Sequence, residues 1–377
     1  MRILHLNFLF YTVSGVWRPI EWSSNCSKLL YSLFTVMTIY LLNFAMLTQL
    51  MDIILVIDNM DDFATTNILF FSSALCKAIT AVIRRDQIVN LTNILQGEPC
   101  KACNEEETAI QTRYDRLIRS CSIGYIVLAS LSATGATVGE VFAVLQGELP
   151  HRGWVPYDYN SPFLFLLTSL QEMLSLILGT TVNIATETLV LGFCLQTCAQ
   201  LEILTHRLHE MTRSRGSKEA SKSLSNKASQ LARHIHHHLC IIRFAKMVNE
   251  VFSEVVFVQF FGSILILCST VYYLSSHVTL EDFANLAVYT ICMFVQILFY
   301  CWAGNEVILK STGLSEAVYH TDWMLLTISE RKDLLMIMKR STRPIQFNSS
   351  FLVTLSLESY GNILKTSYSA FNVLQQS

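Results

Sequence analysis

The sequence predicts an all-α, polytopic membrane protein with seven transmembrane helices, a cytoplasmic N-terminus and an extracellular C-terminus. Three observations support this prediction. Only 15% of the 377 residues are charged, against about 25% in a typical soluble domain. Apolar residues make up 52% of the chain, and the mean hydropathy is +0.41. The basic residues are unevenly divided between alternate loops. This composition excludes a disordered chain and an ordinary cytosolic enzyme.

Each predicted span is a mostly apolar stretch of about 20 residues or more, the length that crosses the hydrocarbon core of a bilayer. The seven stretches are residues 29–57, 63–83, 120–146, 162–201, 255–280, 283–305 and 350–376. Charged residues interrupt several of them, namely Asp52, Lys77, Glu140, Glu172, Glu187, Glu358 and Lys365. The last stretch is the least apolar, which singles it out for closer attention.

The positions of the basic residues predict the orientation. Of the 27 lysines and arginines, 24 lie before the first span or in the connections after the second, fourth and sixth spans. The other connections hold only Arg152. Because basic loops stay in the cytoplasm, the N-terminus and these connections are predicted to be cytoplasmic. That orientation is the reverse of a G-protein-coupled receptor. Residues 3–13 are interpreted as an interfacial helix, with a signal peptide as the alternative.

Cysteines and histidines suggest no catalytic or metal chemistry. None of the eleven cysteines lies in a predicted extracellular loop, so no disulfide framework is predicted. Cys100 and Cys103 form a lone C-x-x-C pair, which is weak evidence for zinc or redox chemistry. We interpret His234 and His236 to His238 as a solvated or interfacial helix face, because consecutive side chains diverge on a helix. The sequence predicts no enzyme activity, cofactor, metal site or nucleic-acid partner.

A polar stripe marks the last span. Residues spaced by four and three share one helix face. The stripe consists of Asn362, Thr366, Ser369, Val373 and Gln376. A polar stripe within a membrane must face water, a partner helix or a ligand. Four such helices related by symmetry could line a pore, with apolar Val373 as a gate. Packing through small polar residues in a monomeric bundle is the equally weighted alternative.

The outer halves of the other spans predict an apolar pocket. Ser132, Gly135 and Gly139 leave one face of the third span nearly bare, which allows either close helix packing or a cavity. The other candidate lining residues are Phe70, Phe71, Phe142, Met173, Ile177, Tyr289 and Met293. Apolar walls with few polar groups suit a small hydrophobic ligand, although simple core packing is the alternative for the whole set. Residues 147–162, rich in proline and aromatic residues, are predicted to form a lid.

The last third of the chain resembles insect odorant receptors. The similar segments are residues 355–360 (LSLESY), residues 363–369 (ILKTSYS), Arg343-Pro344, Gly304-Asn305-Glu306 and residues 243–259. The resemblance implies the odorant-binding subunit of a ligand-gated, nonselective cation channel, which assembles with a shared co-receptor into a heterotetramer. In that family the final helix of each subunit lines the pore. The family's gate valine then falls on Val373 and a pore glutamine on Gln376.

The resemblance also implies partners and a location. The expected partners are a small volatile hydrophobic ligand, the co-receptor subunit, membrane lipid and permeating cations, and the expected location is the plasma membrane of an olfactory neuron dendrite. Residues 1–377 are expected to form one transmembrane domain, in which 199–254 and 306–349 are a cytoplasmic anchor between subunits and 350–377 line the pore. A gustatory receptor-type channel is the alternative, ahead of a G-protein-coupled receptor or a transporter.

Overall fold

The prediction of an all-α fold is confirmed. The computed structural model describes residues 4–19, 22, 24–55, 67–150, 153–159, 161–216, 224–276, 280–349 and 353–376. The helices are α1 (His5–Val13), α2 (Asn25–Leu55), α4 (Ile68–Ile83), α5 (Arg85–Gln96), α6 (Glu105–Gln146), α7 (Pro162–Gly216), α8 (Leu224–Ser276), α9 (Leu280–Tyr319), α10 (Ile328–Ser341) and α11 (Leu357–Gln376). A 3-10 turn η1 (Trp323–Leu325) precedes α10, and strands β1 (Asn348–Ser349) and β2 (Val353–Thr354) pair antiparallel before α11.

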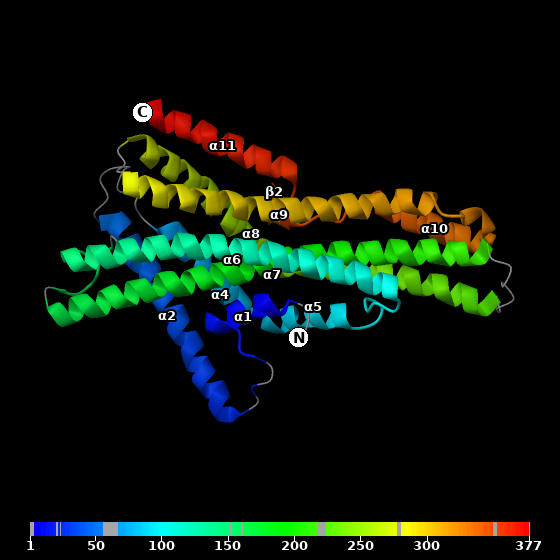
Figure 1. Cartoon of the computed structure of the whole chain (residues 1–377), viewed down its shortest axis with the longest axis horizontal. Helices are drawn as coiled ribbons and strands as arrows, with labels where there is room; N and C mark the ends of the chain where they lie inside the picture. Colours follow the sequence, from blue (N-terminus) through cyan, green and yellow to red (C-terminus); the bar gives the residue numbers. More distant parts are fainter. Residues whose placement is uncertain are drawn as a thin grey trace.

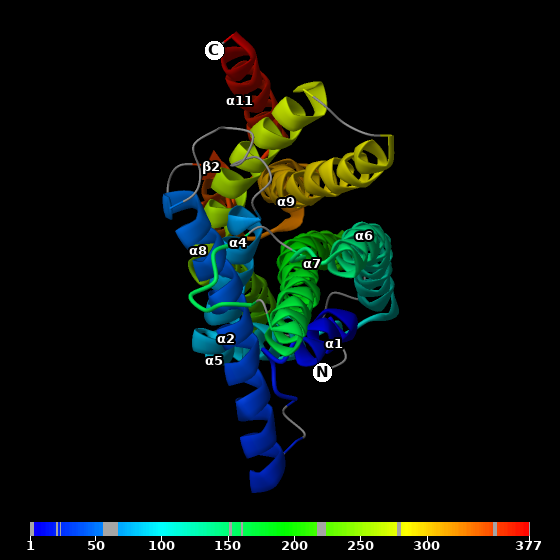
Figure 2. The same cartoon turned by 90° about the vertical axis from the view of Figure 1, so that its left-hand side faces the viewer.

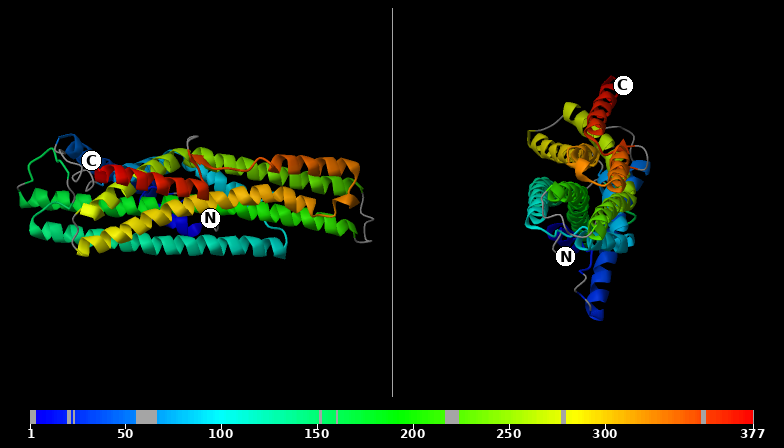
Figure 3. Two further views of the ribbon diagram at one scale, coloured as in Figure 1. Left: turned by 90° about the horizontal axis from the view of Figure 1, so that it is seen from above. Right: turned by 90° about the vertical axis from the view of Figure 1, so that its right-hand side faces the viewer.

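The molecule is elongated because α6, α7, α8 and α9 run along its long axis (Figure 1). Helix α7 is central and contacts α1, α2, α4, α6, α8 and α9. Helix α2 crosses this bundle steeply, and its N-terminal half extends beyond the bundle (Figure 2). Helix α11 packs on α8 and α9 near one end of the bundle, as the view from above also shows (Figure 3). The core therefore forms around one long helix.

Among the described residues, five helices are long and apolar enough to cross a membrane, namely α2, α6, α7, α8 and α9. Helix α4 is apolar but has 16 residues, and residues 63–66 of its predicted span lie outside the described part. Apolar side chains such as Leu29, Leu33 and Val36 are exposed along α2. A continuous exposed apolar face is typical of a surface that lipid covers. These features establish a membrane protein, while the count of seven spans and the orientation remain predictions.

The long helices continue well beyond the predicted spans. Helix α7 runs past residue 201 to Gly216, and α8 begins at Leu224, before the predicted start at residue 255. Helix α10 packs on α9 and α8 at the same end of the molecule (Figure 1). The described parts of segments 199–254 and 306–349 therefore contribute to one helical bundle, in which their apolar faces cover each other.

A glycine determines where the chain enters α11. A Cβ atom at Gly304 of α9 would lie 2.4 Å from both the Cβ and the carbonyl oxygen of Leu355. Any side chain at this position would therefore collide with the backbone that leads into α11. The Leu355 N–H also donates to the Phe347 carbonyl over 2.9 Å. The start of α11 is thus held against α9 by backbone contact.

A half-buried arginine organises the opposite end of the bundle. Arg207 of α7 donates through Nε (2.9 Å) and Nη2 (2.7 Å) to the Glu107 carboxylate of α6. It also donates to the carbonyls of Pro99 (2.7 Å) and Lys101 (2.8 Å), in the segment between α5 and α6. Burial raises the pKa of Glu107, but hydrogen bonds from Arg207 and from the Cys103 N–H outweigh burial and lower it overall. A guanidinium suits this role because its donors are fixed in one plane.

Burial, together with the same arginine, keeps a histidine neutral. His237 Nδ1 lies 3.2 Å from Arg207 Nη1, and His237 Nε2 lies 2.9 Å from Gln200 Oε1. Because Arg207 can only donate, Nδ1 accepts and Nε2 carries the proton. Burial, followed by repulsion from Arg207, lowers the pKa of His237 to about 3. The pKa values of His234 and His238 fall to about 4, chiefly through burial.

The interpretation of these histidines as a solvated face is therefore wrong, except at exposed His236. The side chains of His234, His237 and His238 are buried because α8 is covered from several directions at once. Helices α7, α9 and α10 all pack on it, so residues that diverge around the helix can each meet protein. The run of histidines in the sequence does not indicate which sides of α8 other helices cover.

We expect acid to destabilise this bundle. A histidine whose pKa is about 3 or 4 when folded and about 6.5 when unfolded binds more protons unfolded. Its contribution is present above pH 6.5 and is lost as the pH falls toward 4, at about 1.4 kcal/mol per pH unit for each histidine. The melting temperature of the purified protein should fall between pH 7 and pH 5. His237→Gln should weaken that dependence and His236→Gln should not; equal effects would contradict this account.

Candidate functional site

Four of the predicted pocket residues reach the core. Phe70 and Phe71 of α4 meet edge to face, with ring centroids 5.3 Å apart. Phe71 and Met293 of α9 are buried in the core cluster, and Phe70 and Tyr289 pack against it. Their side chains are aromatic or polarisable, and Tyr289 adds one hydroxyl. All four belong to or pack against one extended core cluster, and a ligand cavity between them stays a prediction.

Gly179 of α7, which was not among the predicted pocket residues, makes space for Phe70. A Cβ atom at Gly179 of α7 would lie 3.1 Å from Phe70 Cε1 and 3.4 Å from Leu42 Cδ2. The missing side chain therefore lets the Phe70 ring sit against the α7 backbone, next to α2. A glycine in the middle of an apolar span was the available signal, because small residues mark close approach between membrane helices.

The other predicted pocket residues are more exposed. Ser132, Gly135 and Met173 are half-buried, and Gly139, Phe142 and Ile177 are exposed. A Cβ atom at Gly139 would meet no atom within 4 Å. In the single chain, these six do not join the buried group around Phe71. The loop predicted to be a lid is attached to the bundle, since the Trp154 N–H donates to the Thr48 carbonyl of α2 over 3.1 Å.

An ion pair lies deep in the bundle, close to this buried group. Lys77 of α4 has a fully buried side chain. Its Nζ lies 2.7 Å from each of three oxygens, Asn183 Oδ1 and Glu187 Oε1 of α7 and Gln259 Oε1 of α8. The ammonium has three donors, so its hydrogen-bonding capacity is met by these acceptors. We call Lys77, Asn183, Glu187 and Gln259 the polar junction.

Sequence reasoning noted two charges of the polar junction but gave them no role. Lys77 and Glu187 each stand out as an ionisable residue within an apolar span. Such residues are costly in a membrane, face the interior and often mark functional positions. That signal was sufficient to nominate both residues. Their pairing was not readable, because 110 positions separate them in the chain.

The polar stripe of α11 faces away from the chain's own bundle. Asn362, Thr366 and Ser369 are exposed. On a neighbouring face of the helix, Ile363 and Ser367 are buried, and the Cys268 thiol of α8 lies 3.5 Å from the Ser367 carbonyl oxygen. The side chains of Val373 and Gln376 lie outside the part that the structure describes. For the three described members, the separation of a buried face from an exposed polar face follows the predicted spacing.

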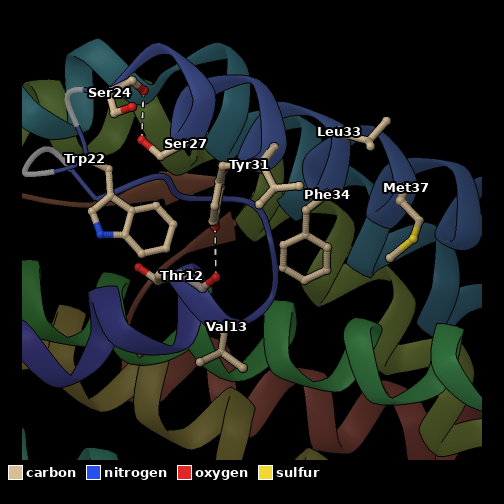
Figure 4. Close-up of a pocket in the computed structure, with 10 residues that line it drawn as sticks. Thr12, Val13, Trp22, Ser24, Ser27, Tyr31, Leu33, Phe34 and Met37 are labelled. Carbon is tan, nitrogen blue, oxygen red and sulfur yellow. Dashed lines mark hydrogen bonds between the residues drawn. The ribbon is translucent and has the colours of Figure 1, made fainter.

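A groove of about 900 Å³ lies elsewhere, between α1 and the N-terminal part of α2 (Figure 4). Leu30, Leu33, Phe34 and Met37 of α2 line one side of it. Thr12 of α1 closes the other side, and its carbonyl accepts a hydrogen bond from Tyr31. Because Leu30 and Leu33 are strongly exposed, we interpret the groove as part of the surface that lipid covers.

Comparison with known proteins agrees with this architecture. A family model described as "7tm Odorant receptor" matches residues 59–368. Odorant receptor 10 of Aedes albopictus is 26% identical over 70% of this chain and 69% of its own length. Odorant receptor 46a, isoform A, of Drosophila melanogaster is 30% identical over 62% of this chain and 61% of its own length.

A solved structure shows the same fold. The olfactory receptor OR5 from Machilis hrabei, in complex with eugenol, superposes with a TM-score of 0.86 at 16% identity. The match covers 98% of this chain and 97% of that one. The helical arrangement is therefore shared even where the sequences have diverged. Since the family model spans most of the chain, this protein belongs to the insect odorant receptor family.

Proposed function

We propose that this chain is the odorant-binding subunit of a ligand-gated, nonselective cation channel, assembled as a heterotetramer with the odorant receptor co-receptor. The observation that carries the proposal is the exposed polar face of α11, which lies beside the face that packs on α8. Four such helices around one axis would place Asn362, Thr366 and Ser369 around a water-filled path for cations. In that arrangement Val373 is the gate and Gln376 lies beyond it.

The ligand site that we propose surrounds Phe70, Phe71, Tyr289 and Met293. Its remaining wall consists of Ser132, Gly135, Gly139, Phe142, Met173 and Ile177, which are exposed or half-buried in this chain. The related receptor from Machilis hrabei was solved with eugenol, which supports a small volatile ligand for this chain too. Aromatic walls with few hydroxyls favour shape and apolar area over a network of hydrogen bonds.

The polar junction is the proposed link between ligand and pore. Lys77 lies two helical turns after Phe70 on α4, so a ligand that displaces Phe70 acts on the same short helix. Gln259 belongs to α8, and α8 packs directly on α11. A ligand shifts the open–closed equilibrium only through its different affinity for the two states. We propose that α4 takes two positions relative to α8, one in the open state and one in the closed state. The polar junction passes the movement of α4 to α8, and α8 passes it to α11.

The remaining parts of the proposal concern membrane placement. We propose that α4 and α11 complete a set of seven spans, with the N-terminus in the cytoplasm and the receptor in the plasma membrane of the olfactory neuron dendrite. The bundle formed by segments 199–254 and 306–349 would then lie in the cytoplasm and hold neighbouring subunits together. The excess of basic residues in these segments supports that side of the membrane.

Co-expression with a co-receptor subunit tests the channel directly. We expect odorants to evoke a cation current in whole-cell recordings, with no loss when G proteins are blocked. Val373→Ala should raise basal current or change the evoked current, because the apolar constriction is widened. A current that disappears when G proteins are blocked would contradict the channel proposal. Wild-type currents in Val373→Ala would remove that residue as the gate.

A pair of glycines provides a matched test of the ligand site. Gly179→Ala places a Cβ atom against Phe70, whereas Gly124→Ala of α6 places one in open space. Both changes add the same methyl group to a helix. We expect Gly179→Ala to change the order in which odorants are preferred. The half-maximal concentration of an odorant should shift by about fourfold for each methylene group that the site gains or loses room for. Gly124→Ala should respond like the wild type. Identical response spectra for the two variants would contradict the placement.

The stability of the protein should depend on both charges of the polar junction being present, or absent, together. Lys77→Met leaves the Glu187 carboxylate buried without its cation and should cost about 3–5 kcal/mol, measured as a large loss of thermal stability. The double variant Lys77→Met, Glu187→Leu should recover much of that stability, yet respond to odorants at shifted concentrations. The exposed pair Lys246–Glu250 provides the control, because Lys246→Met should cost less than about 1 kcal/mol. A double variant with wild-type odorant responses would exclude the junction as the link.

A further inference from the structure

Two cysteines from distant parts of the chain meet outside the proposed ligand site and pore. Cys100 lies in the segment between α5 and α6, and Cys240 lies on α8. Their Sγ atoms are 3.9 Å apart, although 140 positions separate the two residues. Cys100 is buried, and Cys240 is half-buried. Both are free thiols.

The surroundings hold Cys100 in this position. Arg207 donates to the carbonyls of Pro99 and Lys101, the two neighbours of Cys100 in the chain. Cys103 is the second cysteine of the C-x-x-C pair. Its thiol is 3.5 Å from the Lys101 carbonyl oxygen. The close thiol pair is therefore Cys100 with Cys240, and sequence spacing alone suggested Cys100 with Cys103 instead.

We propose that Cys100 and Cys240 are a redox modification site, at which hydrogen peroxide forms a disulfide that ties α8 to the segment between α5 and α6. Cys240 is the attacking sulfur, because its side chain is the more accessible of the two. Cys100 is the resolving sulfur, held within reach by Arg207. The site needs no other residue of the protein for its chemistry.

The electrostatics of the pair support these roles. A hydrogen bond from the Cys100 thiol, with a smaller contribution from Arg243, outweighs burial and lowers the pKa of Cys240 to about 7. The same contact and burial raise the pKa of Cys100. The contact therefore favours the thiolate at Cys240 over the thiolate at Cys100. The thiolate is the nucleophile in peroxide chemistry.

The reaction balances in two steps. The Cys240 thiolate attacks one oxygen of hydrogen peroxide, the O–O bond breaks, and sulfenic acid and hydroxide form. The Cys100 sulfur then attacks the Cys240 sulfur, the S–OH bond breaks, and the released hydroxide leaves with the Cys100 proton as water. A thiolate and a thiol are oxidised to one disulfide, and one peroxide is reduced to a hydroxide and a water; the proton that Cys240 released earlier converts the hydroxide to a second water. The sulfur atoms must approach from 3.9 Å to about 2.05 Å.

The disulfide would restrain the helix that connects the two ends of the molecule. Helix α8 carries His237 beside Arg207, Gln259 of the polar junction, and the surface on which α11 packs. A covalent bond at Cys240 keeps the first part of this helix in the position that the structure shows. We therefore expect peroxide to reduce the odorant-evoked current, and a thiol reductant to restore it.

Peptide mapping tests the modification itself. The full-length chain, co-expressed with the co-receptor subunit, is treated with hydrogen peroxide in intact cells, alkylated with N-ethylmaleimide, digested and analysed by mass spectrometry. We expect a peptide pair joined through Cys100 and Cys240, lost after reduction. It should persist in Cys103→Ser and be absent from Cys100→Ser and Cys240→Ser. A Cys100–Cys103 disulfide, a sulfinic acid at Cys240 without a cross-link, or full alkylation of both thiols would overturn the proposal.

Current recordings test the consequence separately. The peroxide effect on current should be present in the wild type and in Cys103→Ser, and lost in Cys100→Ser and Cys240→Ser. A linked peptide without any change in current would overturn the proposed restraint and leave the modification site established. Because the linked peptide forms whether or not the chain conducts ions, its absence is distinguishable from a failure of the channel proposal.

Discussion

A positive charge inside an apolar bundle is the constraint on which this structure depends. The Lys77 ammonium is stable there only if its three donors find acceptors, because an unpaired charge in a low dielectric costs several kcal/mol. Asn183, Glu187 and Gln259 meet that requirement from two other helices. Helices α4, α7 and α8 must therefore come together at one depth and in one rotational setting, which apolar side chains alone do not specify.

Helix α7 makes specific contacts with other helices at several positions along its length. Gly179 admits a neighbouring ring, Glu187 neutralises the buried lysine, and Gln200 and Arg207 organise the far end through His237 and Glu107. Each of these groups has a partner from a different helix. One continuous helix thus sets the relative positions of the proposed ligand site and of the helix ends around Arg207. A rigid element of this length is suited to keeping distant sites in a constant geometry.

Hydropathy predicted most membrane helices because their apolar stretches are long. On α11 the three described stripe residues are exposed, but Lys365 and Tyr368 are exposed as well, so the role of the stripe stays a prediction. Helix α5 was missed because it is short and amphipathic. A helix around His234 was expected, but the full lengths of α7 and α8 were not, because hydropathy detects apolar stretches and not the polar parts of a helix. The polar junction and the Arg207 network were unpredictable for another reason. Their partners, such as Arg207 and Glu107, are about one hundred positions apart, and only the packed structure shows which buried polar groups satisfy each other.

The contact between Gly304 and Leu355 limits how this sequence can diverge. Since a Cβ atom at position 304 would lie 2.4 Å from the backbone oxygen of Leu355, changing the side chain at 355 cannot relieve the collision. Position 304 is therefore expected to stay glycine through neutral drift, while Leu355 can vary in shape. This chain is only 16% identical to the related receptor from Machilis hrabei. At that level of divergence, a glycine required by the backbone is a reliable position for aligning the last helix.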